Sequence, residues 1–242
     1  MLVLDSSGVL AASTAPAAPA APVASTAPTP PAAPRAPAAS SWVEGRNYFL
    51  IKPPRATDLP KGKVEVTEVF SYACPACNAF QPTMQRIKAS LPPNAVLDFL
   101  PAAFNTAEDW PMFQQAYCTA QALGIADATH GAIFDAVWGS GELAVVDPGT
   151  GRLKAHPPTV EDAARVYEKQ AHVPAAKFVA TARSFQVDAC TRRAEDLIKA
   201  FSVDRTPTLI VNGKYRVNVE SAGGRPEDVI ELVKYLVAQE SR

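Results

Sequence analysis

The sequence predicts an α/β domain interrupted by a block of helices, and three observations support this prediction. Residues 63–101 contain two β-rich runs on either side of a helical pattern, which is typical of a strand–helix–strand unit. Residues 105–200 are rich in alanine and show helical spacing of their apolar residues. Residues 207–242 return to strand patterns and close with a helix. The α/β domain therefore lies on both sides of the helical block.

Local patterns predict each element of the first unit. The runs "KVEVTEVFSY" (residues 63–72) and "AVLDFLP" (residues 95–101) are β-rich, and the second is ended by proline. Between them, the apolar side chains of "PACNAFQPTMQRIKASL" recur every three or four residues, which predicts a helix; these side chains are Cys77, Phe80, Met84, Ile87 and Leu91. Folded sequence is expected to start near Trp42, with one more strand before residue 63.

The remaining elements follow from spacing and turn residues. Four helices are expected in the inserted block, at residues 111–123, 127–138, 159–171 and 174–200. Asn212-Gly213 predicts a hairpin with a two-residue type I′ turn, because that turn needs positive φ at both central residues. The stretch "RPEDVIELVKYLVAQ" predicts a closing helix with Pro226 near its start.

These patterns divide the chain into segments. Positions 11–40 hold 14 Ala and 8 Pro, so residues 1–41 are expected to form a disordered, extended segment. The α/β domain is expected at 42–104 and 191–242, and the helical insertion at 105–190. The start, "MLVLDSSGVLAAS", lacks the basic and long apolar regions of a signal peptide. We therefore expect the export signal to be absent or truncated in this chain, and the Ala/Pro segment is a candidate tether.

Composition excludes some classes of function. The chain is 48% hydrophobic, which suffices for a sizeable core, and its formal net charge is -1. No basic stripe offers a footprint for phosphates, so nucleic acid is not an expected partner. No apolar run approaches the ~18 residues of a membrane-spanning helix.

The main functional signal is the pair of cysteines in "SYACPACNAF". Proline is favoured at the first position of a helix, so Pro75 places Cys74 at the N-cap. There the free backbone N–H groups and the helix dipole favour a thiolate, and the pKa of Cys74 should fall below its usual value. Cys77 lies on the apolar stripe and should be buried. One exposed nucleophile and one buried partner is the arrangement that thiol–disulfide exchange needs.

Two other interpretations of the pair are weaker. A metal site would need two more ligands, but the chain has no second Cys-x-x-Cys motif and no histidine pair with finger spacing. A structural disulfide here would close a very small loop and gain little entropy. A redox pair is therefore favoured, with no metal.

Several separate motifs resemble one family. Glu68, "FSYACPAC" leading into a helix, "ALGI" and "TPTLIVNGKY" occur in the order typical of DsbA-type thiol:disulfide interchange proteins, and the resemblance covers about residues 42–242. It implies a thioredoxin fold with an inserted all-helical domain and a periplasmic oxidoreductase that introduces disulfides into reduced, unfolded exported proteins. It also implies reoxidation by a DsbB-type membrane quinone oxidoreductase, without metal or dissociable cofactor. We expect a monomer.

The sequence departs from the family pattern at two places. Pro75-Ala76 stands where the family usually has Pro-His, so one thiolate-stabilising contact is missing. We therefore predict a less acidic Cys74 and a less oxidising disulfide than in a typical member. Asp98 and Phe99 lie where the family has a buried lysine.

Three further residues receive roles from the resemblance. Glu68 shares a strand face with Val64 and Val66, and its spacing alone favours a rim carboxylate at the end of a strand. The resemblance implies a buried carboxyl with a raised pKa that tunes or deprotonates Cys77. Proline is common at the start of a strand, so Thr206-Pro207 by itself needs no functional explanation. The resemblance instead implies a cis-proline that faces the cysteines and lets the Thr206 backbone pair with client protein.

Cys118 and Cys190 remain. Cys190 shares a helical face with Val187 and Ala194, which is typical of a buried small hydrophobic residue. In an oxidising compartment the even cysteine count favours a structural disulfide between the two. The aromatic residues Phe104, Trp110 and Trp138 are expected to pack between the domains.

The sequence thus predicts a thiol:disulfide oxidoreductase that works as a dithiol oxidase through Cys74-Pro75-Ala76-Cys77. Two alternatives remain open. One is a disulfide reductase or isomerase of the same fold, which the altered dipeptide favours. The other is a non-catalytic periplasmic module that binds peptides or metal ions.

Overall fold

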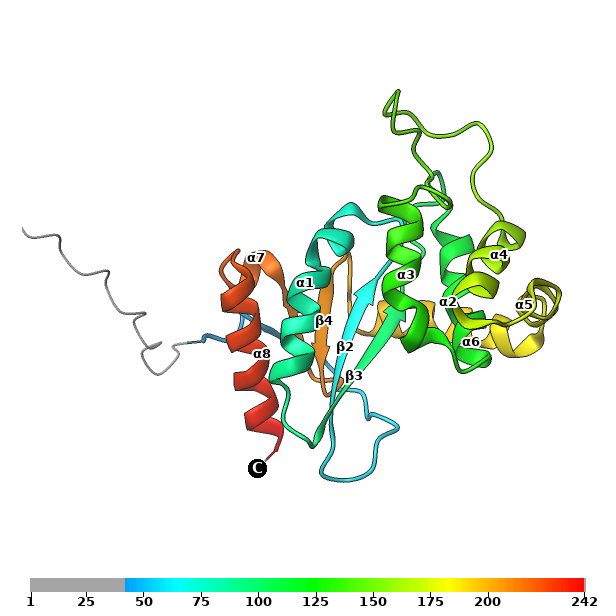
Figure 1. Cartoon of the computed structure of the whole chain (residues 1–242). Helices are drawn as coiled ribbons and strands as arrows, with labels where there is room; N and C mark the ends of the chain where they lie inside the picture. Colours follow the sequence, from blue (N-terminus) through cyan, green and yellow to red (C-terminus); the bar gives the residue numbers. More distant parts are fainter. Residues whose placement is uncertain (1–41, 242) are drawn as a thin grey trace, which may run out of the picture. The chain divides into compact units, whose positions relative to one another are not determined.

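The computed structural model describes residues 42–241 and contains a mixed sheet of five strands in that range (Figure 1). The strand order is β1-β5-β4-β2-β3, and only β2 and β3 are parallel. The strands are β1 (Phe49–Leu50), β2 (Val64–Phe70), β3 (Ala95–Pro101), β4 (Thr208–Val211) and β5 (Tyr215–Asn218). The prediction of a disordered, extended segment concerns residues 1–41, which are outside the described residues.

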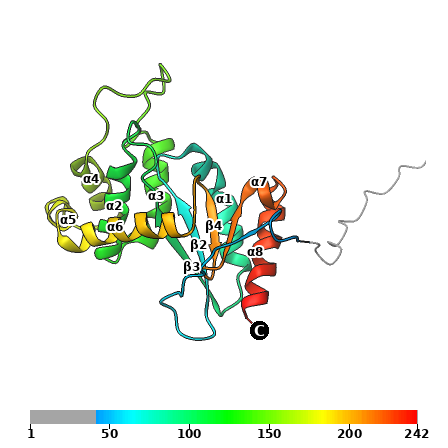
Figure 2. The same ribbon diagram turned by 180° about the vertical axis from the view of Figure 1, so that it is seen from behind.

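Helices cover the sheet on both faces. Helix α1 (Pro75–Ser90) and helix α8 (Pro226–Glu240) pack together in one hydrophobic cluster with side chains of β2, β4 and β5. Helix α6 (Phe185–Ala200) lies behind the sheet in Figure 1 and in front of it in Figure 2. The short helix α7 (Val219–Ala222) links β5 to α8.

Five helices are inserted between β3 and β4. They are α2 (Trp110–Ala122), α3 (Ala126–Trp138), α4 (Val160–Ala171), α5 (Ala175–Ala182) and α6 (Phe185–Ala200). The prediction of a single helix over 174–200 is wrong, because the chain breaks into α5 and α6. The Ser184 hydroxyl accepts a hydrogen bond from the backbone nitrogen of Val187 and caps α6, which gives the new helix its start. The predicted domain boundary after residue 190 falls inside α6.

Most predicted elements are confirmed. Strand β3 has the predicted bounds, and β2 lies within the predicted run 63–72. Asn212 and Gly213 have φ of 53° and 61°, the values that a type I′ turn requires. The fold class is confirmed as an α/β sheet domain with an inserted helical segment. Among the described helices, none has the length and apolar character needed to cross a membrane.

The two hydrophobic clusters meet at Phe99 of β3, which packs against both. One lies under α1 and α8, and the other joins the end of β2 to the inserted helices. Phe70, the last residue of β2, contacts the rings of Tyr72, Phe99 and Tyr117. The chain therefore leaves β2 through a well-packed region immediately before the cysteine pair.

Candidate active site

Cys74 is the N-cap of α1, as Pro75 at the first helical position predicted. Its backbone is extended, with φ of −81° and ψ of 116°, and its sulfur accepts a hydrogen bond from the backbone nitrogen of Cys77 at 3.2 Å. The sulfur thus takes the place of the serine or aspartate oxygen that usually caps a helix. A negative charge at this position meets the positive end of the helix dipole.

A second donor reaches the same sulfur from another part of the chain. The hydroxyl of Thr206 lies 3.2 Å from Sγ of Cys74, although 132 residues separate the two. This contact corrects one expectation, because Cys74 is only 4% exposed rather than open to solvent. The loop that carries Thr206 lies against the sulfur and covers it.

The two thiols have opposite acidities. The pKa of Cys74 is lowered to about 6. The largest cause is a hydrogen bond from the Cys77 side chain; the Thr206 hydroxyl and the backbone N–H groups of Cys77 and Ala76 lower the pKa further, and burial opposes them. Burial raises the pKa of Cys77, which has no exposed surface. At neutral pH Cys74 is therefore a thiolate and Cys77 a thiol.

Ala76 contributes to this environment only through its backbone. Its side chain is exposed and carries no donor, so the only hydrogen bond that it gives the Cys74 sulfur is that of its N–H. The structure therefore agrees with the absence of the imidazole contact that the sequence indicated.

Glu68 lies in the centre of the sheet rather than at its rim. It belongs to β2 and is paired with Phe99 of β3 and Leu209 of β4, and none of its surface is exposed. Within the described residues neither carboxyl oxygen has a hydrogen-bond partner. Burial, with the charge of Cys74 as a smaller cause, raises the pKa of Glu68 well above its usual value. A carboxyl in this position holds a proton near the two cysteines.

The Thr206–Pro207 peptide bond is cis, and the loop that carries it faces Cys74. Beside it a groove of about 280 Å³ extends from Ala76 and Phe80 on α1 to Pro207 and Val219. Its apolar lining and its position next to the sulfur are suited to a polypeptide that reacts at Cys74.

Cys118 and Cys190 form a disulfide in the structure, with an S–S distance of 2.05 Å, and join α2 to α6. Cys190 is half-buried rather than a core residue. Cys74 and Cys77 are both free thiols.

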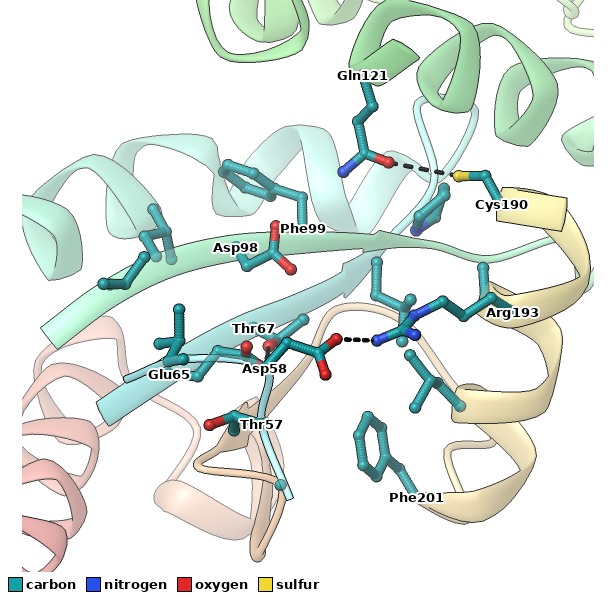
Figure 3. A pocket seen from close by; sticks show the side chains of 18 of the residues that line it. Thr57, Asp58, Glu65, Thr67, Asp98, Phe99, Gln121, Cys190, Arg193 and Phe201 are labelled. Carbon is teal, nitrogen blue, oxygen red and sulfur yellow. Dashed lines mark hydrogen bonds and ion pairs between the residues drawn. The ribbon is translucent and has the colours of Figure 1, made fainter. Parts of the chain in front are cut away.

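A second cavity lies on the other face of the sheet, between β2, β3 and α6 (Figure 3). It has a volume of about 380 Å³ and is lined by Glu65, Thr67 and Asp98, with Arg193 paired to Asp58 at its edge. Neither cysteine of the redox pair lines it, so it is separate from the thiol site. Asp98 and Phe99 both line this cavity.

The sequence did not identify the residues that hold the turn before Cys74. Tyr72, in this turn, contacts Trp138 and His130 of α3 through hydrogen bonds. Of the three aromatic residues expected to pack between the domains, Trp110 is buried, but Phe104 and Trp138 are 43% and 37% exposed. Their position near the insertion was visible in the sequence, but their partners were not.

A reactive thiol at the N-terminus of a helix, a buried partner three residues later and a cis-proline loop against the sulfur define a thioredoxin-fold dithiol protein. Among residues 42–241, no group of three or more His, Cys, Asp or Glu side chains forms a candidate metal site.

Comparisons with known proteins agree with this class. The family model described as thioredoxin matches residues 59–224. The thiol:disulfide interchange protein DsbA of Pseudomonas aeruginosa strain PAO1 is 32% identical over 204 residues, which cover 84% of this chain and 87% of the relative. The crystal structure of DsbA from Xylella fastidiosa has a TM-score of 0.70 at 29% identity, with 82% of this chain and 97% of that chain covered. The crystal structure of the Pseudomonas aeruginosa DsbA has a TM-score of 0.67 at 31% identity, with 82% and 94% covered. The chain belongs to the DsbA family of thiol:disulfide oxidoreductases.

Proposed function

We propose that the protein is a dithiol oxidase that transfers the Cys74–Cys77 disulfide to reduced, unfolded proteins after their export. The observation that carries the proposal is the contrast between the two thiols: a pKa of about 6 at Cys74 beside a fully buried Cys77 whose pKa is raised. A reduced form that contains a stabilised thiolate makes the corresponding disulfide a stronger oxidant.

The exchange proceeds in two steps. A client thiolate attacks Sγ of Cys74, the Cys74–Cys77 bond breaks, and Cys77 leaves with the electron pair and takes up a proton. The second client thiolate then attacks the client sulfur of the mixed disulfide and releases Cys74 as its thiolate. The client loses two electrons and gains a disulfide, and the protein keeps both electrons as a dithiol.

Glu68 is the proposed proton donor and acceptor for Cys77. Burial raises the pKa of Glu68 well above its usual value, which favours the protonated form, and the ionised form of Glu68 in turn raises the pKa of Cys77. Proton transfer to Cys77 as it leaves avoids a second thiolate in a site without solvent.

The loop at Thr206 and Pro207 is the proposed binding element for clients. Its backbone is available to pair with an extended client segment, and the adjacent apolar groove accepts side chains without demanding a particular sequence. We further propose that the protein works in the periplasm, as a monomer, and is reoxidised by a DsbB-type membrane quinone oxidoreductase. The likeness to the thiol:disulfide interchange proteins named above supports this assignment.

Two assays test the direction of electron flow. An oxidase forms disulfides in a reduced, unfolded client faster than it reduces insulin, and Cys74→Ser abolishes both reactions. Insulin reduction as the dominant activity would instead identify a reductase, an alternative favoured by Ala76 in place of histidine. Client binding that is unchanged in Cys74→Ser, without any disulfide formation by the unaltered protein, would identify a non-catalytic module.

A further inference from the structure

Helix α3 holds Tyr72, two residues before Cys74, at two points. The backbone oxygen of Tyr72 accepts a hydrogen bond from the indole Nε1 of Trp138 at 2.8 Å, and its hydroxyl lies 3.2 Å from Nδ1 of His130. Trp138 is the last residue of α3, which lies beside α1 in both ribbon views (Figures 1 and 2). One inserted helix therefore contacts both the backbone and the side chain of the turn that leads to the redox pair.

The same turn is fixed from within by Ser71. The Ser71 hydroxyl accepts a hydrogen bond from the backbone nitrogen of Ala73 at 3.3 Å, and its carbonyl accepts one from the backbone nitrogen of Cys74 at 3.1 Å. The Tyr72 carbonyl belongs to the next peptide group and needs a donor of its own, because buried carbonyls are rarely left unpaired. Within the described residues, the indole of Trp138 is that donor.

We propose that Trp138 is a positioning residue for Cys74. By holding the Tyr72 carbonyl, its indole N–H fixes the turn, and the turn fixes the place of the Cys74 sulfur at the start of α1. Two of the donors to that sulfur, the backbone nitrogen of Cys77 and the hydroxyl of Thr206, lie at 3.2 Å. Hydrogen bonds weaken as distance and angle depart from their preferred values, so a looser turn weakens both contacts. The inference rests on the proposed function, because it concerns the sulfur that reacts.

Packing alone does not account for Trp138. The ring of Tyr72 is held by Phe113 and Phe134, which are 1% and 2% exposed. Trp138 is 37% exposed and meets Tyr72 through the backbone instead. Removal of the N–H group should therefore affect the turn more than it affects the core.

The first test is Trp138→Phe, which keeps an aromatic ring and removes the donor. The reduced protein is alkylated with iodoacetamide over a range of pH, and the rate reports the Cys74 thiolate. We expect the pKa of Cys74 to rise by about half a unit, because a looser turn weakens, without removing, the hydrogen bonds that stabilise the thiolate. The glutathione equilibrium should shift about threefold toward the protein disulfide, since that factor equals half a unit.

Trp110→Phe is the matched control. The Nε1 of Trp110 also donates a hydrogen bond, to the carboxylate of Glu108 at 3.0 Å, and within the described residues neither of the two forms a hydrogen bond with the turn. This variant should keep the pKa of Cys74 and the glutathione equilibrium of the unaltered protein. Equal changes in both variants would show a general loss of packing and would overturn the proposal.

A second variant separates the N–H group from the shape of the ring. Site-specific replacement of Trp138 by benzothienylalanine keeps the bicyclic ring and puts sulfur in place of the N–H group. The proposal expects the same rise in the pKa of Cys74 as in Trp138→Phe, and an unchanged pKa would overturn it. These measurements use no client, so they remain interpretable if the unaltered protein proves not to be an oxidase.

Discussion

At the scale of single residues, two opposing effects act on the Cys74 sulfur. Burial disfavours its charge, and hydrogen bonds from Cys77, Thr206 and Ala76 favour it. A hydrogen bond to a charged acceptor contributes ~1.5–3 kcal/mol, whereas one pKa unit corresponds to ~1.4 kcal/mol. A few such bonds therefore outweigh the cost of desolvation, and the thiolate dominates at neutral pH.

Ala76→His tests the effect of the missing imidazole. A histidine at this position brings a cationic ring near the thiolate, so the pKa of Cys74 should fall by about one unit and the disulfide should become more oxidising. The glutathione equilibrium is expected to move about tenfold toward the dithiol, since one unit equals a factor of ten.

Ala79→His is the control, because Ala79 is also exposed but lies one turn further along α1. It should leave the pKa of Cys74 near 6. If Ala76→His has no larger effect than this control, the dipeptide does not set the acidity of the sulfur.

Glu68→Gln tests proton transfer to Cys77. The amide keeps the shape of the side chain but cannot exchange a proton at neutral pH. We expect reduction of the oxidised protein by dithiothreitol to slow by about 100-fold at pH 7, which is the low end for loss of a general acid or base. The pH profile of that rate should also flatten.

Glu65→Gln gives the comparison on the same strand, since Glu65 is half-buried and accepts a hydrogen bond from Thr67 at 3.0 Å. Its profile should match that of the unaltered protein. A Glu68→Gln variant with an unmoved profile and an unchanged urea midpoint would exclude Glu68 from the reaction.

At the scale of elements, a disulfide adds a covalent link to the packing that holds the inserted helices together. The Cys118–Cys190 disulfide joins α2 to α6 across 72 residues. Helix α6 also packs against β3, where it forms one wall of the cavity in Figure 3. The disulfide therefore connects the first helix of the inserted segment to the last, which returns the chain to the sheet.

Replacing both Cys118 and Cys190 by alanine should reduce the free energy of unfolding by at most about 4 kcal/mol, the loop-closure value for this separation. Urea unfolding of the oxidised variant and of the unaltered protein measures the difference. The pKa of Cys74 should not change, because neither residue contacts the sulfur. A stability equal to that of the unaltered protein would show that the disulfide is not structural.

At the scale of the whole molecule, stability should depend on the redox state in a pH-dependent way. In the reduced protein the folded pKa of Cys74, about 6, lies below the value of ~8.5 for an unfolded thiol. The folded state therefore binds fewer protons between these values, and the thiolate stabilises it as pH rises. This contribution is complete above about pH 8.5 and is lost as pH falls through 6.

The oxidised protein has no thiol at positions 74 and 77. The difference in stability between the reduced and the oxidised form therefore reports the titration of these two thiols alone. We expect the reduced form to gain about 2 kcal/mol relative to the oxidised form between pH 6 and 8, after allowance for solvent screening. Above about pH 8.5 the trend should reverse, because the raised pKa of Cys77 keeps a proton that the unfolded chain releases. Urea unfolding of both forms at several pH values measures the difference, and a constant difference would contradict the assigned acidity of Cys74.

Over the whole chain, the predictions that succeeded depend on residues near one another in sequence. The N-cap at Cys74 follows from Pro75, and the type I′ turn follows from Asn212-Gly213. The single helix over 174–200 failed because a serine cap outweighed a continuous apolar pattern at Ser184. Local propensity is a weak guide where a cap and a helical pattern compete.

The sequence by itself determined the reactive pair, the helix that carries it and the family resemblance. The tertiary structure alone decided how far the sulfur is covered, that Glu68 is fully buried and that Trp138 reaches Tyr72. The contacts responsible join residues 132 and 66 positions apart. Such contacts form only when the sheet and the inserted helices pack together, and no pattern within a few residues records them.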